Sequence, residues 1–529
     1  MLQTPRATRG MVVAPHHLAA QAGLRVLREG GNAIEATIAA ASTVAVVYPH
    51  MNSLGGDNFW LIAFGRATPV GLEACGAAAA AADAAFYRRR GRDEIPARGP
   101  LAANTSAGAI AGWQAALRIS DRWGGRLPLA RLLEDARTYA RDGFPVTRSQ
   151  HANTEAKRAE LIDLPGFAET FLDGGKTPAV GARFEQPALA ETLKRLGKSG
   201  LDDFYRGGLA RAIGAELERV GSPLSAEDLA GQRAREVRPL KVDLRSGAVY
   251  NLPPPTQGLA SLIMLALFDR LGCAEAEGFD HLHGLVEAAK CAFRVRDAHV
   301  TDPAYMACDP ESFLTEAALS DLAAAIDPDK AAPWGSRAAG GDTVWLGAID
   351  GEGRAVSFIQ SIYWEFGSGV VLRETGILWQ NRGASFKLAE GAQNRLVPGR
   401  KPFHTIQPAL ALLGDGRVMV YGAMGGEGQP QTQAALFTRH VMFGQGLQAA
   451  VTAPRWLLGR TWGAARSNLR LENRFSADLV AALAAAGHDI ELVGPFDEVM
   501  GHAGALVRHP SGLIEGAADP RGDGLVAAF

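Results

Sequence analysis

Thr343, in the stretch Gly341-Asp342-Thr343, is the residue whose type and surroundings best suit nucleophilic chemistry. A loop rich in glycine and alanine, residues 331–341, precedes it, and the apolar run 344–349 follows it. This order predicts a loop that enters a buried strand. If the Asp342–Thr343 peptide bond were cut, the new α-amine, with a pKa of about 7.7–8.0, would be the nearest base for the Thr343 hydroxyl. The plainer alternative is a capping Asp342 followed by a β-branched residue that starts a strand.

A second candidate is the pair Gly425-Gly426, which follows a strand predicted over residues 417–421. Glycine amides have no Cβ beside them, and at a strand-to-helix turn they can point at developing negative charge. The pair alone is weak evidence, but behind a candidate N-terminal threonine it predicts an oxyanion hole. Losing one such donor typically slows acyl transfer by about a hundred- to a thousandfold.

Thr343 must be positioned by a β-hairpin. The apolar runs 344–349 and 355–362 flank Asp350-Gly351-Glu352-Gly353, which has the composition of a turn. Ser361 lies on the second strand, 18 positions after Thr343 (361 − 343).

Alanine-rich and apolar segments elsewhere predict helices, over residues 20–28, 33–47, 259–271 and 280–300. In the last of these, Glu287 and Lys290 are three apart and predict a structural ion pair. His281 and His283 are two apart and do not share a helix face, so we expect no zinc site there. The chemistry expected of Thr343 needs no metal or organic cofactor.

Composition argues against several classes of partner. The chain has 54 basic and 56 acidic residues and a net charge of −2, so no basic field favours nucleic acid or an anionic membrane. The most apolar run, residues 38–48, is too short to cross a bilayer. The four cysteines are widely spaced, which suits reduced thiols, and the N-terminus lacks the pattern of a signal peptide. We therefore expect a cytoplasmic location.

Several motifs in order along the chain resemble the γ-glutamyltransferase family of self-cleaving N-terminal-nucleophile hydrolases. They are Gly30-Gly31-Asn32-Ala33, Gly341-Asp342-Thr343, Glu374-Thr375-Gly376-Ile377-Leu378, Pro408, Gly422-Ala423-Met424-Gly425-Gly426 and Gly516-Ala517-Ala518-Asp519-Pro520-Arg521. The resemblance implies an α+β fold, a four-layer αββα sandwich that forms one continuous domain. It also implies self-cleavage between Asp342 and Thr343 into a large subunit, 1–342, and a small subunit, 343–529, which stay interlocked and could also form a homodimer.

The same resemblance assigns roles around Thr343. Ser361 takes the place of a hydroxyl residue that orients the nucleophile, and Tyr363 replaces the family's usual asparagine. The turn that contains Asn52 and Asp57 matches a segment near the family's active site, where these side chains either support the site or serve only the turn. No Gly-Lys-Ser/Thr follows it, so nucleotide binding is not expected.

The residues that would hold a γ-glutamyl group have changed. The family's carboxylate-binding arginine is absent from the segment with Glu73, and no acid stands near Ser385 to hold an α-amine. Instead Arg382, beside Asn381, could form a bidentate pair with a substrate carboxylate, or could pair with a protein acid. His404 and Thr405 replace two serines that contact the substrate carboxylate in the family.

We therefore expect a self-processing amide hydrolase that acts through a threonyl acyl-enzyme on a small carboxylate-bearing amide, as oxamate amidohydrolases do. The first alternative is a γ-glutamyl hydrolase or transferase that acts on glutathione or related compounds. The second is an unprocessed scaffold without catalysis. For the enzyme, the expected partners are the amide substrate, water and the two subunits of one precursor.

Overall fold

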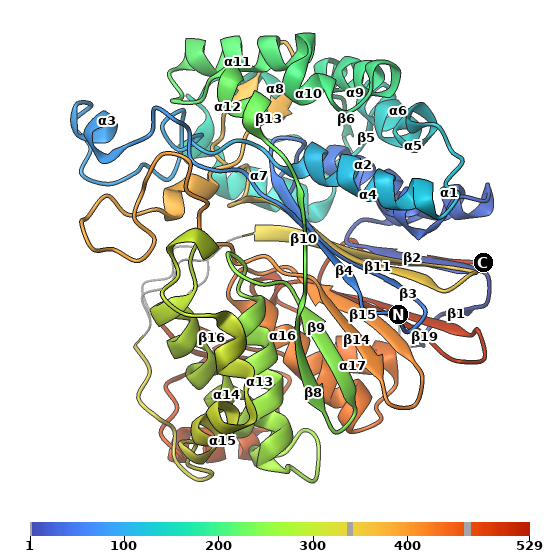
Figure 1. The fold of residues 1–529 in the computed structure, drawn as a ribbon, viewed down its shortest axis with the longest axis vertical. Helices are drawn as coiled ribbons and strands as arrows, with labels where there is room; N and C mark the ends of the chain where they lie inside the picture. The colour runs from blue at the N-terminus through green and yellow to red at the C-terminus, as the bar shows by residue number, and fades with distance from the viewer. Residues whose placement is uncertain (1–2, 336–341, 460–466) are drawn as a thin grey trace.

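Two seven-stranded sheets lie face to face at the centre of the molecule, with helices on both outer faces (Figure 1). The structure is a computed structural model of the continuous chain and describes residues 3–335, 342–459 and 467–529. The layers confirm the predicted αββα sandwich. The loop predicted before the cleavage site lies outside the described residues from 336 to 341, and the Asp342 side chain is likewise not described.

The first sheet contains Thr343 and has the order β21-β2-β10-β11-β3-β4-β7. Its strands are β21 (Leu525–Ala528), β2 (Gly10–Ala14), β10 (Asp342–Asp350), β11 (Arg354–Tyr363), β3 (Asp57–Phe64), β4 (Val70–Ala74) and β7 (Arg235–Val237). Strands β10 and β11 pair antiparallel, which confirms the predicted hairpin.

The second sheet has the order β1-β20-β19-β15-β14-β9-β8. Its strands are β1 (Arg6–Ala7), β20 (Ile514–Ala518), β19 (Ala503–Arg508), β15 (Val418–Ala423), β14 (Ala409–Leu413), β9 (Gly247–Asn251) and β8 (Leu240–Leu244). A smaller sheet joins β16 (Trp456–Gly459), β17 (Asn468–Glu472) and β18 (Ile490–Val493).

Apolar side chains between the two large sheets form one core, because alternate residues of each strand point to the same face. Phe59, Ile359 and Leu410 belong to it. Trp345 of β10 reaches across to the second sheet, where a Cβ on Gly422 would come within 2.1 Å of its ring. Glycine is required at that position because the indole occupies the space a side chain would need.

Helices cover the outer face of the first sheet. They include α1 (His17–Arg28), α2 (Ala33–Val47), α4 (Ala109–Arg122), α6 (Glu134–Asp142), α7 (Arg148–Leu161), α9 (Pro187–Ser199) and α11 (Gly208–Val220). Helix α2 is buried along its whole length, and Asn32 and Glu35 form a capping box at its start. The break that Gly30 and Gly31 predicted is therefore confirmed.

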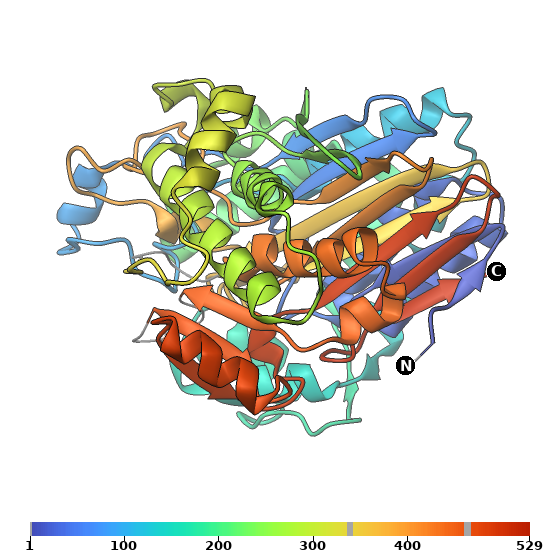
Figure 2. The ribbon, with the colours of Figure 1, turned by 90° about the horizontal axis from the view of Figure 1, so that it is seen from below.

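Another group of helices covers the second sheet (Figure 2). It includes α13 (Gly258–Leu271), α14 (Phe279–His299), α15 (Glu316–Ala324), α16 (Gly428–Phe437), α17 (Leu447–Thr452) and α18 (Ala477–Ala485). Lys290 Nζ lies 2.6 Å from Glu287 Oε1 in the interior, which confirms the predicted ion pair.

The four cysteines are free thiols. Among the described helices, none is both long and apolar enough to cross a membrane.

Candidate active site

Thr343 lies at a β-bulge near the start of β10. Asp342 pairs with Tyr363 and Val344 pairs with Gln360, so the register shifts by one residue between them. Thr343 therefore faces the Ser361–Ile362 step of β11 without a regular partner. Its side chain is 1% exposed. Because the bulge interrupts the regular ladder, the Thr343 side chain need not follow the alternation of the strand residues after it.

Gln429 holds the hydroxyl of Thr343. Its Nε2 donates to Thr343 Oγ1 at 3.3 Å, and its Oε1 accepts the Gln407 N–H at 3.2 Å. The second bond fixes the amide so that its donor side faces Thr343. Sequence reasoning missed Gln429, although three glutamines within six residues of a wholly buried helix start were a signal.

Gly425 and Gly426 form the turn between β15 and α16, as predicted. Their φ angles are +112° and +54°, in the region that favours glycine. The Gln429 N–H donates to Gly426 O at 3.2 Å, so the residue that binds Thr343 also contacts this turn. Within the described residues, the Gly425 and Gly426 amides donate to no acceptor. Both donors are thus available to an oxyanion.

Buried polar contacts brace the turn from the side of α13 and α14. Gln257 Nε2 donates to Gly426 O at 2.9 Å, while its Oε1 accepts from Arg296 Nη1 at 2.9 Å. Arg296 Nη2 also pairs with Glu427 Oε1 at 3.0 Å, and both side chains are buried. These contacts fix the backbone on which an oxyanion hole depends.

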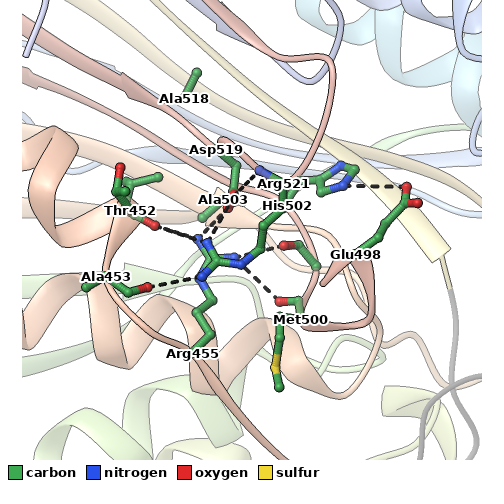
Figure 3. Close-up of polar contacts among 12 residues, drawn as sticks. Thr452, Ala453, Arg455, Glu498, Met500, His502, Ala503, Ala518, Asp519 and Arg521 are labelled. Carbon is green, nitrogen blue, oxygen red and sulfur yellow. Dashed lines mark hydrogen bonds and ion pairs between the residues drawn. The ribbon is translucent and has the colours of Figure 1, made fainter. Parts of the chain in front are cut away.

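A second brace comes from the segment before β19 (Figure 3). Arg455 Nη1 donates to Gly501 O at 2.9 Å, and its Nη2 pairs with Asp519. Asp519 Oδ2 accepts the Ala503 N–H at 2.6 Å. Because the Met424 N–H donates to His502 O at 2.9 Å, this network supports the Gly425-Gly426 turn from behind.

Ser361 and Tyr363 lie at the end of β11 beside Thr343. The Tyr363 N–H donates to Ser361 Oγ at 2.8 Å. Tyr363 has φ +82°, which is uncommon for a residue with a bulky side chain. Its ring lies under the Arg382 guanidinium, 4.0 Å from the ring centroid to Cζ. Tyr363 therefore links the end of the hairpin to the predicted substrate-binding residue.

Arg382 begins the short helix η3 (Arg382–Ser385) and is 1% exposed. Its Nη1 donates to Thr405 Oγ1 at 3.3 Å, and its Nη2 has no partner among the described residues. No described carboxylate lies within 4.0 Å of the guanidinium, so the alternative of a paired protein acid finds no support there. Burial lowers its pKa to about 10, against the opposing effect of Tyr363 and Asp57.

His404 and Asp57 lie beside Arg382. His404 Nε2 is 3.9 Å from Asp57 Oδ2, and both residues are buried. Burial lowers the pKa of His404 well below its usual value, and Arg382 acts in the same direction. The imidazole is therefore neutral. Asp57 thus lies beside the predicted substrate-binding segment. This position favours the interpretation in which its side chain supports the site over the one in which it serves only the turn.

Two predicted substrate-binding residues contact other parts of the protein. Asn381 Oδ1 accepts the Trp364 N–H at 3.1 Å, and its Nδ2 donates to Ala97 O at 2.8 Å. Ser385 is half-buried, and its Oγ accepts from Asn394 Nδ2 at 3.3 Å. Glu73, which stands where the family has its arginine, pairs with Lys401 and Arg235. Its charge is compensated within the protein.

Three potential metal ligands come from α14 and from the residues just before β18. The donor atoms of His283, Glu287 and His488 lie within 4.8 Å of one another. His283 Nδ1 and His488 Nε2 share a hydrogen bond of 2.9 Å, and Glu287 is paired with Lys290. The nearby ammonium and these internal bonds do not suit a cation site. His281 is not in this group; its Nε2 is bonded to Thr438 instead.

Comparison with known proteins agrees with this geometry. The oxamate amidohydrolase proenzyme of Klebsiella pneumoniae is 54% identical over 524 residues, 99% of each chain. The glutathione hydrolase-like YwrD proenzyme of Bacillus subtilis is 42% identical over 519 residues, 98% of each chain. The crystal structure of cephalosporin acylase from Bacillus halodurans superposes with a TM-score of 0.92 at 34% identity, over 100% of this chain and 97% of that one.

The family model described as Gamma-glutamyltranspeptidase matches residues 19–529. Because this match and the relatives span nearly the whole chain, the protein is an enzyme of the gamma-glutamyltranspeptidase family.

Proposed function

We propose that the protein is a self-processing amidohydrolase in which Thr343 is the nucleophile, acting on small amides that carry a carboxylate. The observation that carries the proposal is the position of Thr343. It lies opposite the bulge that Ser361 and Ile362 form in β11, its hydroxyl is bonded to Gln429, and Gln429 in turn contacts the Gly425-Gly426 turn. This arrangement supports a nucleophile at Thr343 and oxyanion donors at Gly425 and Gly426.

Maturation begins at the bond that holds Thr343 in the chain. The Thr343 hydroxyl attacks the carbonyl carbon of Asp342, and the C–N bond breaks as its nitrogen takes a proton. The resulting ester is hydrolysed by water, which frees the Asp342 carboxylate and the Thr343 α-amine. That amine has an ordinary pKa of about 7.7–8.0 and can accept the hydroxyl proton in later turnovers.

Turnover repeats the same acyl transfer on the substrate. Thr343 Oγ attacks the amide carbon, the Gly425 and Gly426 amides stabilise the oxyanion, and the nitrogen leaves with a proton. Water then hydrolyses the Thr343 ester. Ser361 lies across the hairpin from Thr343, where it can orient the hydroxyl.

The evidence for a carboxylate-bearing substrate is Arg382, because its Nη2 is buried without a partner in the described structure. Thr405 and Tyr363 hold the guanidinium in place. The relative at 54% identity is named an oxamate amidohydrolase, and oxamate is a small amide beside a carboxylate.

The test is a Thr343→Ala variant assayed with oxamate and with glutathione. We expect the wild-type protein to give two bands on a denaturing gel and to hydrolyse oxamate. The variant should stay full length and lose turnover. Activity retained by Thr343→Ala would mean that another residue is the nucleophile. One persistent full-length band from active wild-type protein would remove the maturation step, whereas the same band from inactive protein would favour the scaffold.

A γ-glutamyl hydrolase or transferase is the second candidate, and one observation favours it. Asp57 lies close to Arg382, so the pair could hold the ammonium and carboxylate of an amino acid. Strong glutathione turnover without oxamate turnover would select this candidate. Amine acceptors added to the assay would distinguish transfer from hydrolysis.

A further inference from the structure

Three neighbouring buried side chains have polar atoms without partners. These atoms are Asp57 Oδ2, Arg382 Nη2 and both ring nitrogens of His404, within the part of the chain that the structure describes. Each residue is at most 1% exposed. A buried polar group without a hydrogen bond is costly and rare, so several together indicate a site built for a ligand.

The three side chains belong to one cluster beside the nucleophile. His404 Nε2 lies 3.9 Å from Asp57 Oδ2, and Arg382 Nη1 is bonded to Thr405, the residue after His404. Asp57 of β3 pairs in register with Ser361 of β11, which faces Thr343 across the hairpin. Asp57 is therefore two strands away from Thr343, at the same end of the first sheet.

Asp57 is held so that one oxygen remains for a ligand. Its Oδ1 accepts the N–H groups of Gly76 and Gly108, both at 2.9 Å. Burial raises its pKa to about 7, against the smaller effects of these bonds, Arg382 and Gln380. Among the described residues, His404 lies beside Asp57, and the Asp57 charge also acts on Cys75 and Tyr205; burial keeps these three groups neutral near pH 7.

When Asp57 is protonated, its Oδ2 and the Arg382 Nη2 can both donate hydrogen bonds, while the two ring nitrogens of neutral His404 are one donor and one acceptor. The only net charge on these three side chains is then the positive charge of Arg382. Such a cluster suits a carboxylate. A bound carboxylate would also favour the protonated form of Asp57, because a like charge disfavours ionisation. An α-amino acid head group would need the opposite state, an ionised Asp57 facing the ammonium.

We propose that Asp57 is a substrate-binding residue that donates its proton in a hydrogen bond to the substrate carboxylate, together with Arg382, and so selects carboxylates without a neighbouring ammonium. The inference rests on the proposed function and specifies its substrate class. It makes binding dependent on pH: when Asp57 is ionised, substrate binds only with uptake of one proton.

The test compares oxamate with oxamide, its neutral diamide, in the processed wild-type enzyme between pH 5.5 and 9. The ratio of the two KM values cancels effects common to both, including titration of the Thr343 amine. We expect the ratio of oxamate KM to oxamide KM to rise about tenfold per pH unit above about pH 7, as the protonated fraction of Asp57 falls. A ratio that stays constant would overturn the proposal.

Asp57→Asn is the matched variant, because Oδ1 can still accept from Gly76 and Gly108 while Nδ2 remains a donor. Its self-cleavage and Tm report whether it folds. We expect its KM ratio to be independent of pH and close to the low-pH value of the wild type. A ratio that still rises with pH, in a variant that processes normally, would also overturn the proposal.

Two results separate this inference from the proposed function. If oxamate is turned over with a constant ratio, only the role of Asp57 fails. If oxamate is not turned over, calorimetric titration of oxamate into wild-type protein at pH 8, in two buffers of different ionisation enthalpy, counts protons taken up on binding. Uptake of about one proton would support Asp57 and its absence would overturn it. Loss of glutathione turnover in Asp57→Asn, with oxamate inert, would instead assign Asp57 to an ammonium.

Discussion

Arg382 is the one residue in the cluster with a fixed charge, and its Thr405 contact leaves Nη2 unused within the described structure. We expect Arg382→Ala to raise the KM for oxamate with a smaller effect on kcat, because a charge-assisted hydrogen bond contributes about 1.5–3 kcal/mol. That range corresponds to about a ten- to hundredfold change. The measurement is steady-state kinetics on the processed enzyme.

The matched control is Arg373→Ala, which removes an arginine paired with Glu169 at the surface. Its kinetics should equal those of the wild type. An unchanged KM in Arg382→Ala would assign Arg382 to structure. Oxamide provides an internal control, since it has no carboxylate for Arg382 to bind.

At the scale of single residues, the type of a side chain was a better guide to its role than its position next to another candidate. Arg382 could be selected because a guanidinium can form a bidentate pair with a carboxylate, a rule that requires no coordinates. Asn381 was selected only as its neighbour, and its amide contacts the backbone of residues 364 and 97. Contacts between residues this far apart in sequence depend on the folded chain, so their partners could not be identified from local pattern.

Helix α16 contributes to the site through its first turn, where Gln429 contacts Thr343. We expect Gln429→Leu to lower kcat about two- to tenfold and to slow self-cleavage, because a neutral hydrogen bond contributes about 0.5–1.5 kcal/mol. KM should change little, since Gln429 contacts Thr343 and no group of the Arg382 cluster. Rates of processing and of oxamate hydrolysis test this.

Gln429→Glu is the matched variant, because it keeps the shape and loses the amide donor. It should be slowed at least as much as Gln429→Leu. Normal kcat in both variants would show that the Thr343 contact has no role in turnover. A lowered Tm with normal kcat per folded molecule would assign Gln429 to packing.

The elements around Thr343 differ in how far the sequence determines them. The β10–β11 hairpin was predictable because its apolar runs and its Asp350–Gly353 turn are local signals. The bulge at Thr343 was not, because it arises from register with Tyr363 and Gln360 across the hairpin. The contact between Gln429 and Thr343 spans 86 positions and could not be predicted from local sequence either.

On the scale of the whole molecule, the four layers followed from family resemblance, while the strand order did not. Strand β10 pairs with β2, and Gly347 opposite Val13 lies 334 positions away (347 − 13). Such pairing is set by burial of both sheet faces, which local periodicity does not encode. This order has a consequence for the processed enzyme, because it places segments from both sides of Thr343 in each sheet.

Cleavage before Thr343 would give chains of 342 and 187 residues (529 − 342) that share both sheets. In the first sheet, β10 and β11 lie between β2 and β3 of the large subunit. In the second, β14 pairs with β9. Separating the subunits would break strand pairs in both sheets and expose the core between them. We therefore expect the processed protein to elute as one species in size-exclusion chromatography and to separate only in denaturant. Two species under native conditions would contradict this, and a peak of twice the chain mass would indicate a homodimer of the heterodimer.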